Sequence, residues 1–171
     1  MERAHFVENR IFTDKRGTFS PLDLTKLDKN WVQSNISVNP RKYTLRGLHF
    51  QKNEYAQAKL IKVIKGHILD FVVDLRMVSE DYNKIFFFDM KEGDEIYVPR
   101  YFAHGFITLE ENTIVQYLVD NDYLRLMNGN KSLFADIKYE TIRYYLYLDE
   151  DTLDMPYALH TKESQKNGKQ Y

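Results

Sequence analysis

The segment TLRGLHFQ, residues 44–51, holds the residue types of this chain that are best suited to chemistry. It places Arg46, Gly47 and His49 close together on one predicted strand. The guanidinium group of arginine suits bidentate recognition of a phosphate, and histidine transfers protons near neutral pH. The pattern therefore indicates a site where a phosphorylated ligand lies beside a general base. A second segment, PRYFAHGF at residues 99–106, adds His104 to the candidates.

The spacing of Arg46 and His49 determines whether both side chains can reach one pocket. Side chains alternate between the two faces of a strand, so residues three positions apart point to opposite faces. Both side chains reach one pocket only if Gly47 introduces a bulge or if the strand ends there. We therefore expect the strand to be irregular at Gly47.

Two more polar side chains are predicted to face the protein interior. Lys59 shares its strand face with Ile61 and Val63, and a buried ammonium group is costly unless it meets a ligand or an acid. Tyr117 shares its face with two valines, which directs its hydroxyl group into the same interior. Each residue also has a structural explanation, because a lysine can extend to the rim and Tyr117 is one of 13 tyrosines.

The elements that must position these residues are predicted to be short strands. Residues 59–65 and 67–74 are rich in β-branched residues and flank Gly66, which is typical of paired strands. Further strands are predicted at residues 84–90, 95–98, 105–109 and 113–120. Helical periodicity is weak, with short turns expected near residues 22–27 and after residue 136. Strands at this spacing predict an all-β antiparallel sandwich or barrel.

Composition excludes several classes of protein. The 171 residues predict a single domain, 1–171, with a polar tail at about 161–171. A net charge of -1 without a basic cluster argues against nucleic-acid binding. The absence of cysteine excludes disulfides, thiolate nucleophiles and Cys-ligated metals. No apolar run reaches the ~18 residues of a membrane span, and the start lacks a signal-peptide core. We therefore expect a cytoplasmic protein with no membrane partner.

The chain resembles the dTDP-4-dehydrorhamnose 3,5-epimerases and related nucleotide-sugar epimerases. The matching segments occur in family order: DKRGTF (14–19), QSNIS (33–37), LRGLHFQ (45–51), QAKL (57–60), VDLR (73–76), Pro99 with FAHGF (102–106), and QY (116–117). The resemblance implies a cupin-type jelly-roll barrel with short peripheral helices, and a homodimer with exchanged N-terminal strands. It also implies catalysis without a metal or an organic cofactor.

The sequence itself agrees with the expectation of no metal. Metal-binding cupins typically carry a His-x-His pair with a downstream Glu, whereas here His49 is followed by Phe50 and Gln51. The five histidines include no close pair with the spacing of metal ligands.

The resemblance also implies a role for each candidate residue. In a 4-keto sugar, the protons at C3 and C5 lie next to the carbonyl group and are removable. His49 is the expected base, and Tyr117 is the acid on the other face of the sugar. Lys59, with His104, would stabilise the enolate oxygen. The remaining roles concern the nucleotide-sugar substrate: Arg16 and Arg46 at the diphosphate, Gln33 and Asn35 as hydrogen-bonding groups, and Tyr123 near the base.

The chain departs from the family pattern at three places. The family places a late Asp behind the base, and here the candidates are Asp151, which we favour, and Glu163. Pro21 stands where the family usually has a Glu that helps to bind the nucleotide. The region after Tyr123 lacks the usual Tyr-x-Pro and Trp-Asn-Asp pattern. These changes leave the nucleotide and the sugar open more than the proton chemistry.

The sequence therefore predicts an epimerase that inverts C3, C5 or both in a dTDP-linked 4-keto-6-deoxy sugar. One alternative is an enzyme that inverts C3 only or takes another nucleotide, such as a GDP-heptose. The other is a non-catalytic cupin that binds a nucleotide sugar. A 3,4-ketoisomerase is disfavoured, because its relatives usually carry a His-x-His at the position of His49.

Overall fold

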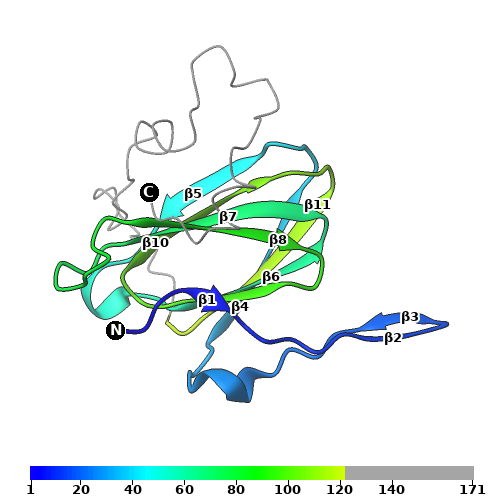
Figure 1. The fold of residues 1–171 in the computed structure, drawn as a ribbon, viewed down its shortest axis with the longest axis horizontal. Helices are drawn as coiled ribbons and strands as arrows, with labels where there is room; N and C mark the ends of the chain where they lie inside the picture. Colours follow the sequence, from blue (N-terminus) through cyan, green and yellow to red (C-terminus); the bar gives the residue numbers. More distant parts are fainter. Residues whose placement is uncertain (122–171) are drawn as a thin grey trace, which may run out of the picture.

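The computed structural model describes residues 1–121, and strands dominate this part of the chain (Figure 1). The elements are β1 (His5–Phe6), β2 (Phe12–Asp14), β3 (Gly17–Phe19), β4 (Gln33–Asn39), β5 (Leu45–His49), β6 (Lys59–Lys65), β7 (His67–Asp74), β8 (Ile85–Lys91), β9 (Glu95–Val98), β10 (Phe102–Thr108) and β11 (Thr113–Val119), with two short 3-10 helices, η1 (Leu24–Leu27) and η2 (Asn53–Tyr55). Neither of these helices is long enough to cross a membrane. The expectation of an all-β fold is confirmed.

The strands form two antiparallel sheets that face each other. One sheet has the order β1-β9-β6-β11-β4 and the other has the order β5-β10-β7-β8. From β4 to β11 the chain changes sheet at every step except between β7 and β8, which are neighbours in the four-stranded sheet, as in a jelly roll. β4 and β5 are the edge strands at the same end of their sheets, so the barrel can open between them.

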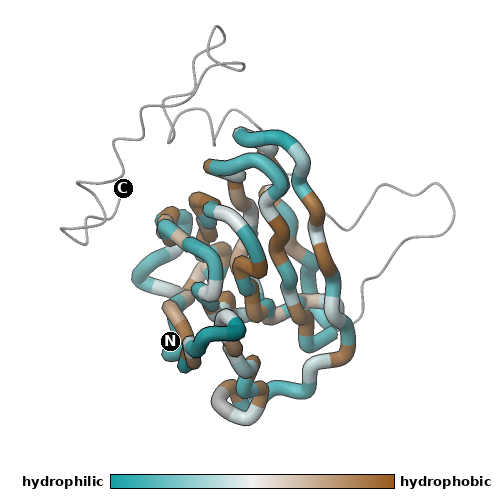
Figure 2. The backbone as a smooth tube through the Cα atoms, turned by 90° about the vertical axis from the view of Figure 1, so that its right-hand side faces the viewer, coloured by the Kyte–Doolittle hydropathy of each residue, from teal (hydrophilic) through white to brown (hydrophobic). Residues whose placement is uncertain are grey.

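The main core lies between the two sheets, and hydrophobic and hydrophilic residues are interspersed along the tube in Figure 2. Eleven buried residues form this interior cluster: Ile61, Val63, Ile68, Val72, Phe88, Met90, Ile96, Val98, Phe102, Phe106 and Val115. A second cluster occupies the other face of the four-stranded sheet: Leu48, Phe71, Val73, Ile85 and Ala103. A polar residue therefore reaches the interior only where it lies on the inner face of its strand.

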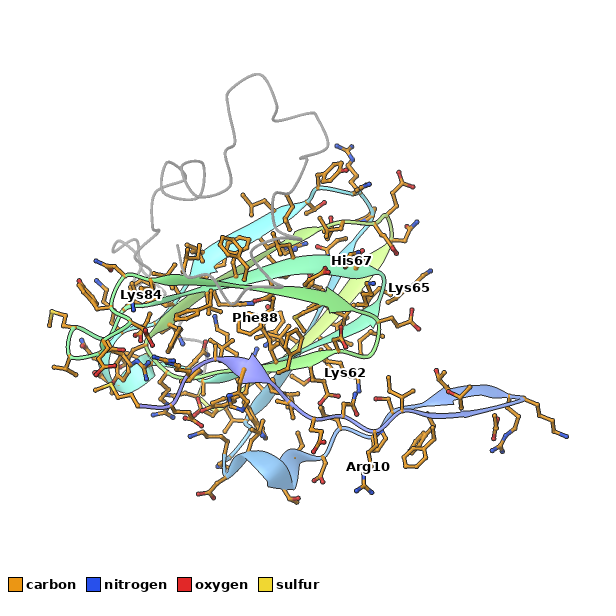
Figure 3. The ribbon with its side chains drawn as sticks, viewed as in Figure 1. Arg10, Lys62, Lys65, His67, Lys84 and Phe88 are labelled. Carbon is orange, nitrogen blue, oxygen red and sulfur yellow. The ribbon has the colours of Figure 1, made fainter. Side chains whose placement is uncertain are left out.

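Residues 9–20, here called the arm, extend away from the barrel (Figures 1 and 3). β2 and β3 pair only with each other, and all their residues are exposed. Phe12 is 55% exposed and Phe19 is 67% exposed.

A buried polar cluster on the outer face of the five-stranded sheet holds the base of the arm. Lys62 Nζ lies 2.7 Å from Glu95 Oε1 and donates to Ser20 Oγ at 2.8 Å. Asn9 Nδ2 donates to the same hydroxyl oxygen at 2.9 Å and to the Gly93 carbonyl oxygen at 2.8 Å. The arm is therefore attached at its base and exposed along its length.

The predicted strands from residue 59 onward agree with the structure, with the largest difference at β10, which begins at Phe102 rather than at residue 105. The turn expected near residues 22–27 is η1. The helical turn expected after residue 136 lies outside the described residues. β1 to β4 were not predicted. β1, β2 and β3 have two or three residues, which are too few to show an alternating pattern. In β4 the inner face is polar, and the apolar residues Ile36 and Val38 are exposed.

Candidate active site

A cavity of about 560 Å³ opens between the two sheets, within the size range of small-molecule sites. Its walls come from β4, β5, β6, β10 and β11. The predicted site residues that line it are Gln33, Asn35, Arg46, His49, Lys59, His104 and Tyr117. Residues from five separate strands thus meet in one cavity.

The irregularity expected at Gly47 is confirmed. His49 pairs with His104 while Arg46 pairs with Phe106, so three steps along β5 match two steps along β10. The extra residue brings Arg46 and His49 to the same cavity. Gly47 has a φ of +99°, and the peptide bond that follows it is cis. A Cβ atom there would lie 2.5 Å from the His104 carbonyl oxygen, so the close approach of β5 to β10 requires glycine.

Lys59 is the buried cation of the cavity wall, only 7% exposed. Its Nζ donates to the backbone carbonyl oxygen of His49 at 3.2 Å. Burial lowers the pKa of Lys59 to about 8, although the negative charge of Asp70 acts in the opposite direction. The ammonium group is therefore poorly neutralised by the protein and is placed to interact with a negative charge that develops in the cavity.

Asp70 is a buried carboxylate that the sequence alone did not single out. It is fully buried, and its Oδ2 lies 2.7 Å from His104 Nε2. Burial raises the pKa of Asp70, while the His104 ring and the Lys59 ammonium group oppose that rise. Within residues 1–121 its second oxygen, Oδ1, has no hydrogen-bond partner. Asp70 therefore orients the His104 ring toward the cavity and supplies a negative charge that acts on Lys59.

The side chain of Arg46 is held by Asn39, another residue that the sequence did not single out. Arg46 Nε donates to Asn39 Oδ1 at 2.6 Å. Asn39 is buried on β4, whereas Arg46 and His49 are exposed at the mouth of the cavity. The arginine at the mouth is thus connected to a buried amide on the facing sheet.

The two candidate proton-transfer residues stand on different sheets. His49 belongs to β5 of the four-stranded sheet, and Tyr117 belongs to β11 of the five-stranded sheet. Tyr117 lies directly across from Asn35 on one side and Ile61 on the other. Gln33 Nε2 donates to Asn35 Oδ1 at 2.7 Å, which forms a polar wall beside the tyrosine. A ligand in the cavity would therefore have His49 and Tyr117 on opposite sides.

Arg16 is the predicted site residue that the structure does not bring to this cavity. It lies on the arm with its side chain exposed, and it pairs with Asp14 at 2.6 Å. A second hollow, bounded by β2 and β3, is lined by Arg16 together with Phe12 and Phe19. Tyr123, Asp151 and Glu163 lie outside the described residues. Within residues 1–121, no group of three histidines or carboxylates is arranged to hold a metal ion.

The family model for dTDP-4-dehydrorhamnose 3,5-epimerase matches residues 1–139. The chain belongs to the dTDP-4-dehydrorhamnose 3,5-epimerase family. A family protein from Sinorhizobium fredii is 37% identical over 125 residues. That match covers 68% of this chain and 64% of the Sinorhizobium protein, so it spans less than two thirds of the relative's length.

Solved structures of dTDP-4-dehydrorhamnose 3,5-epimerases share this fold. The enzyme of Bacillus anthracis, with TDP and PPi bound, is 34% identical and has a TM-score of 0.71. The alignment covers 91% of this chain and 85% of that one. A Legionella pneumophila epimerase in complex with dTDP-4-keto-L-rhamnose is 25% identical with a TM-score of 0.70, over 91% and 79% of the two chains. The cupin-type jelly roll implied by the resemblance is thereby confirmed.

Proposed function

We propose that this protein is an epimerase that inverts C3, C5 or both in a dTDP-linked 4-keto-6-deoxy sugar. The observation that carries the proposal is the placement of His49 and Tyr117 on opposite sheets around one cavity, with Lys59 in the wall. Family membership supports the substrate class, since the Legionella relative was solved with dTDP-4-keto-L-rhamnose.

In the proposed reaction, neutral His49 removes the proton from the carbon next to the ketone. The electron pair of the broken C–H bond forms a C=C bond, and the carbonyl electrons move to the ketone oxygen. The Lys59 ammonium group and the His104 ring stabilise that oxygen, as preorganised donors do in a cavity that excludes water. Tyr117 then returns a proton to the carbon from the opposite face. The proposed chemistry uses no metal and no organic cofactor.

Substrate binding is assigned to the polar side chains around the mouth. Arg46 takes the diphosphate, and Gln33 and Asn35 donate or accept hydrogen bonds along the wall formed by β4. Tyr123 near the base, and a carboxylate behind His49 from Asp151 or Glu163, stay predictions. A single domain over residues 1–171 and a cytoplasmic location also stay predictions.

We further propose a homodimer in which the arm of one copy lies against the other. The support is the arm's exposed aromatic residues, Phe12 and Phe19, on a two-stranded hairpin. An isolated hairpin of this kind is marginally stable in water. A partner copy would cover these rings, and Arg16 would then bind the diphosphate of the substrate held in the partner's cavity. Light scattering coupled to size-exclusion chromatography measures the molar mass and so tests the homodimer. The molar mass of a monomer throughout the micromolar concentration range would overturn the proposal.

Hydrogen exchange with solvent tests the epimerase proposal. The protein is incubated with dTDP-4-keto-6-deoxyglucose in deuterium oxide, and the C3 and C5 positions are followed by NMR. Deuterium at both positions supports inversion at both carbons, and deuterium at C3 alone supports a C3 epimerase. No exchange, combined with measurable binding of the nucleotide sugar, would identify a non-catalytic cupin.

A further inference from the structure

Arg46 and Asn39 are joined across the opening of the barrel. Arg46 lies on β5, the edge strand of the four-stranded sheet, and Asn39 ends β4, the edge strand of the five-stranded sheet. Their hydrogen bond, 2.6 Å from Arg46 Nε to Asn39 Oδ1, is the one that holds the guanidinium group among residues 1–121. The only covalent link between the two residues is the chain segment 40–45, so this bond spans the gap between the sheets.

The amide group of Asn39 has a fixed orientation. Its side chain is buried, with the residue 1% exposed. Its Nδ2 donates to the Thr113 carbonyl oxygen at 3.1 Å and to the Ser37 carbonyl oxygen at 3.2 Å. Because both of these partners are acceptors, the amide nitrogen must face them and the amide oxygen must face the arginine. Ser37 Oγ also donates to Oδ1 at 3.1 Å.

This arrangement limits how Arg46 can bind an anion. A guanidinium group binds an oxyanion in a bidentate manner through Nη1 and Nη2, or through Nε and one Nη. Asn39 occupies Nε, so the Nη1–Nη2 edge is the one left for a ligand. An arginine side chain has considerable rotamer entropy, and restraint of an exposed side chain before binding reduces the entropy that is lost on binding.

We propose that Asn39 is a positioning residue that presents the Nη1–Nη2 edge of Arg46 to the diphosphate of the substrate. This inference rests on the proposed function, because it requires that the ligand be a nucleoside diphosphate sugar. It assigns Asn39 no contact with the ligand. Asn39 acts through Arg46, so its effect on binding depends on the presence of that arginine.

A double-mutant cycle tests this dependence. The Kd for dTDP is measured by calorimetry for the wild-type protein, Asn39→Ala, Arg46→Ala and the double variant. We expect Asn39→Ala to weaken binding about tenfold, the size of one lost hydrogen bond to a charged group. In the Arg46→Ala background the same substitution should change the Kd less than twofold. In turnover, Asn39→Ala should raise KM with kcat nearly unchanged.

Ser34→Ala is the matched control, because Ser34 lies on β4 with its side chain on the outer, exposed face. Its Kd for dTDP should equal that of the wild-type protein. If Asn39→Ala does not fold, Asn39→Ser replaces it, since serine keeps a polar group at the site but is too short to reach Arg46.

The outcomes separate this inference from the proposed function. If wild-type protein binds dTDP and loses the same affinity on Asn39→Ala with or without Arg46, Asn39 is merely structural and the inference is wrong. If Asn39→Ala leaves the Kd unchanged, the inference is also wrong while the proposed function stands. If the wild-type protein binds neither dTDP nor pyrophosphate, both are overturned.

Discussion

β6 carries two buried lysines on its opposite faces, and only one of them has an ion-pair partner within residues 1–121. Lys59 and Lys62 are each 7% exposed. Lys62 lies on the outer face, paired with Glu95 at 2.7 Å and bonded to Ser20. Lys59 lies on the cavity side, where its one hydrogen bond within residues 1–121 goes to a backbone carbonyl oxygen.

The two lysines differ in what the acidic residue near each of them binds. Glu95 is directly across from Lys62 in the register of β6 and β9, and it pairs with the lysine. Asp70, the acid near Lys59, is instead hydrogen-bonded to His104. One lysine is therefore neutralised within the protein and holds the base of the arm. The other has no ion-pair partner within residues 1–121 and lies beside the candidate base, which suits it to a negatively charged intermediate.

Replacement of Lys62 by methionine should produce the largest loss of stability. It leaves Glu95 buried without its partner, which typically costs about 3–5 kcal/mol. Urea unfolding would measure the loss, and the folded fraction should keep kcat within a few-fold of wild type. The double variant Lys62→Met/Glu95→Leu should recover most of the stability. A single variant as stable as wild type would show that the two lysines do not differ in this way.

Replacement of Lys59 by methionine should lower activity without lowering stability. We expect kcat to fall by about 10²–10³, the cost of removing one preorganised donor to an oxyanion. The melting temperature should not fall, because a poorly neutralised buried cation is removed. Lys65→Met, at the exposed end of the same strand, is the control for both measurements. An active Lys59→Met variant would contradict the proposed role of Lys59.

The pH dependence should sharpen the comparison, because the pKa of Lys59 is lowered to about 8 from 10.5. As pH rises through about 8, Lys59 loses its proton in the free protein, so kcat/KM should fall about tenfold per pH unit above that value. In Lys59→Arg the guanidinium group stays charged, and this decline should disappear. An identical decline in that variant would assign it to another group.

Ionisation of Lys59 should affect stability and activity in opposite directions: the free energy of unfolding should rise with pH where activity falls. Between pH 8 and 10.5 the unfolded chain holds a proton on Lys59 that the folded chain has lost. The free energy of unfolding therefore gains a contribution that rises with pH across this window. Chemical denaturation of wild type and Lys59→Met at a series of pH values would isolate the contribution, which must be absent from the variant.

The sequence predicted the inward direction of Lys59 and Tyr117 because strand parity is a local property, whereas Gln33 and Asn35 were assigned from the family resemblance. The inward direction of Lys59 and Tyr117 follows from their apolar neighbours on the same strand face. The bulge at Gly47 followed from the spacing of Arg46 and His49. These arguments need only a few consecutive residues.

The residues that the sequence missed depend on contacts between distant strands. Asp70 is 34 residues from His104, and the register of β7 and β10 puts Asp70 opposite Phe106, diagonally across from His104. A carboxylate on the same strand face as Ile68 and Val72 was the available signal. Asn39 reaches Arg46 because β4 and β5 are edge strands of facing sheets. The sequence also did not show that Arg16 lies on an arm away from this cavity; its role at the diphosphate stays a prediction.

The most direct test of the proton-transfer assignment compares two variants in deuterium oxide. His49→Asn and Tyr117→Phe are each incubated with dTDP-4-keto-6-deoxyglucose, and NMR follows deuterium incorporation and inversion separately. We predict that His49→Asn shows neither. Tyr117→Phe should still incorporate deuterium with retained configuration, because His49 can remove a proton and return a deuteron on the same face. Exchange in His49→Asn at the wild-type rate would contradict the assignment of His49 as the base.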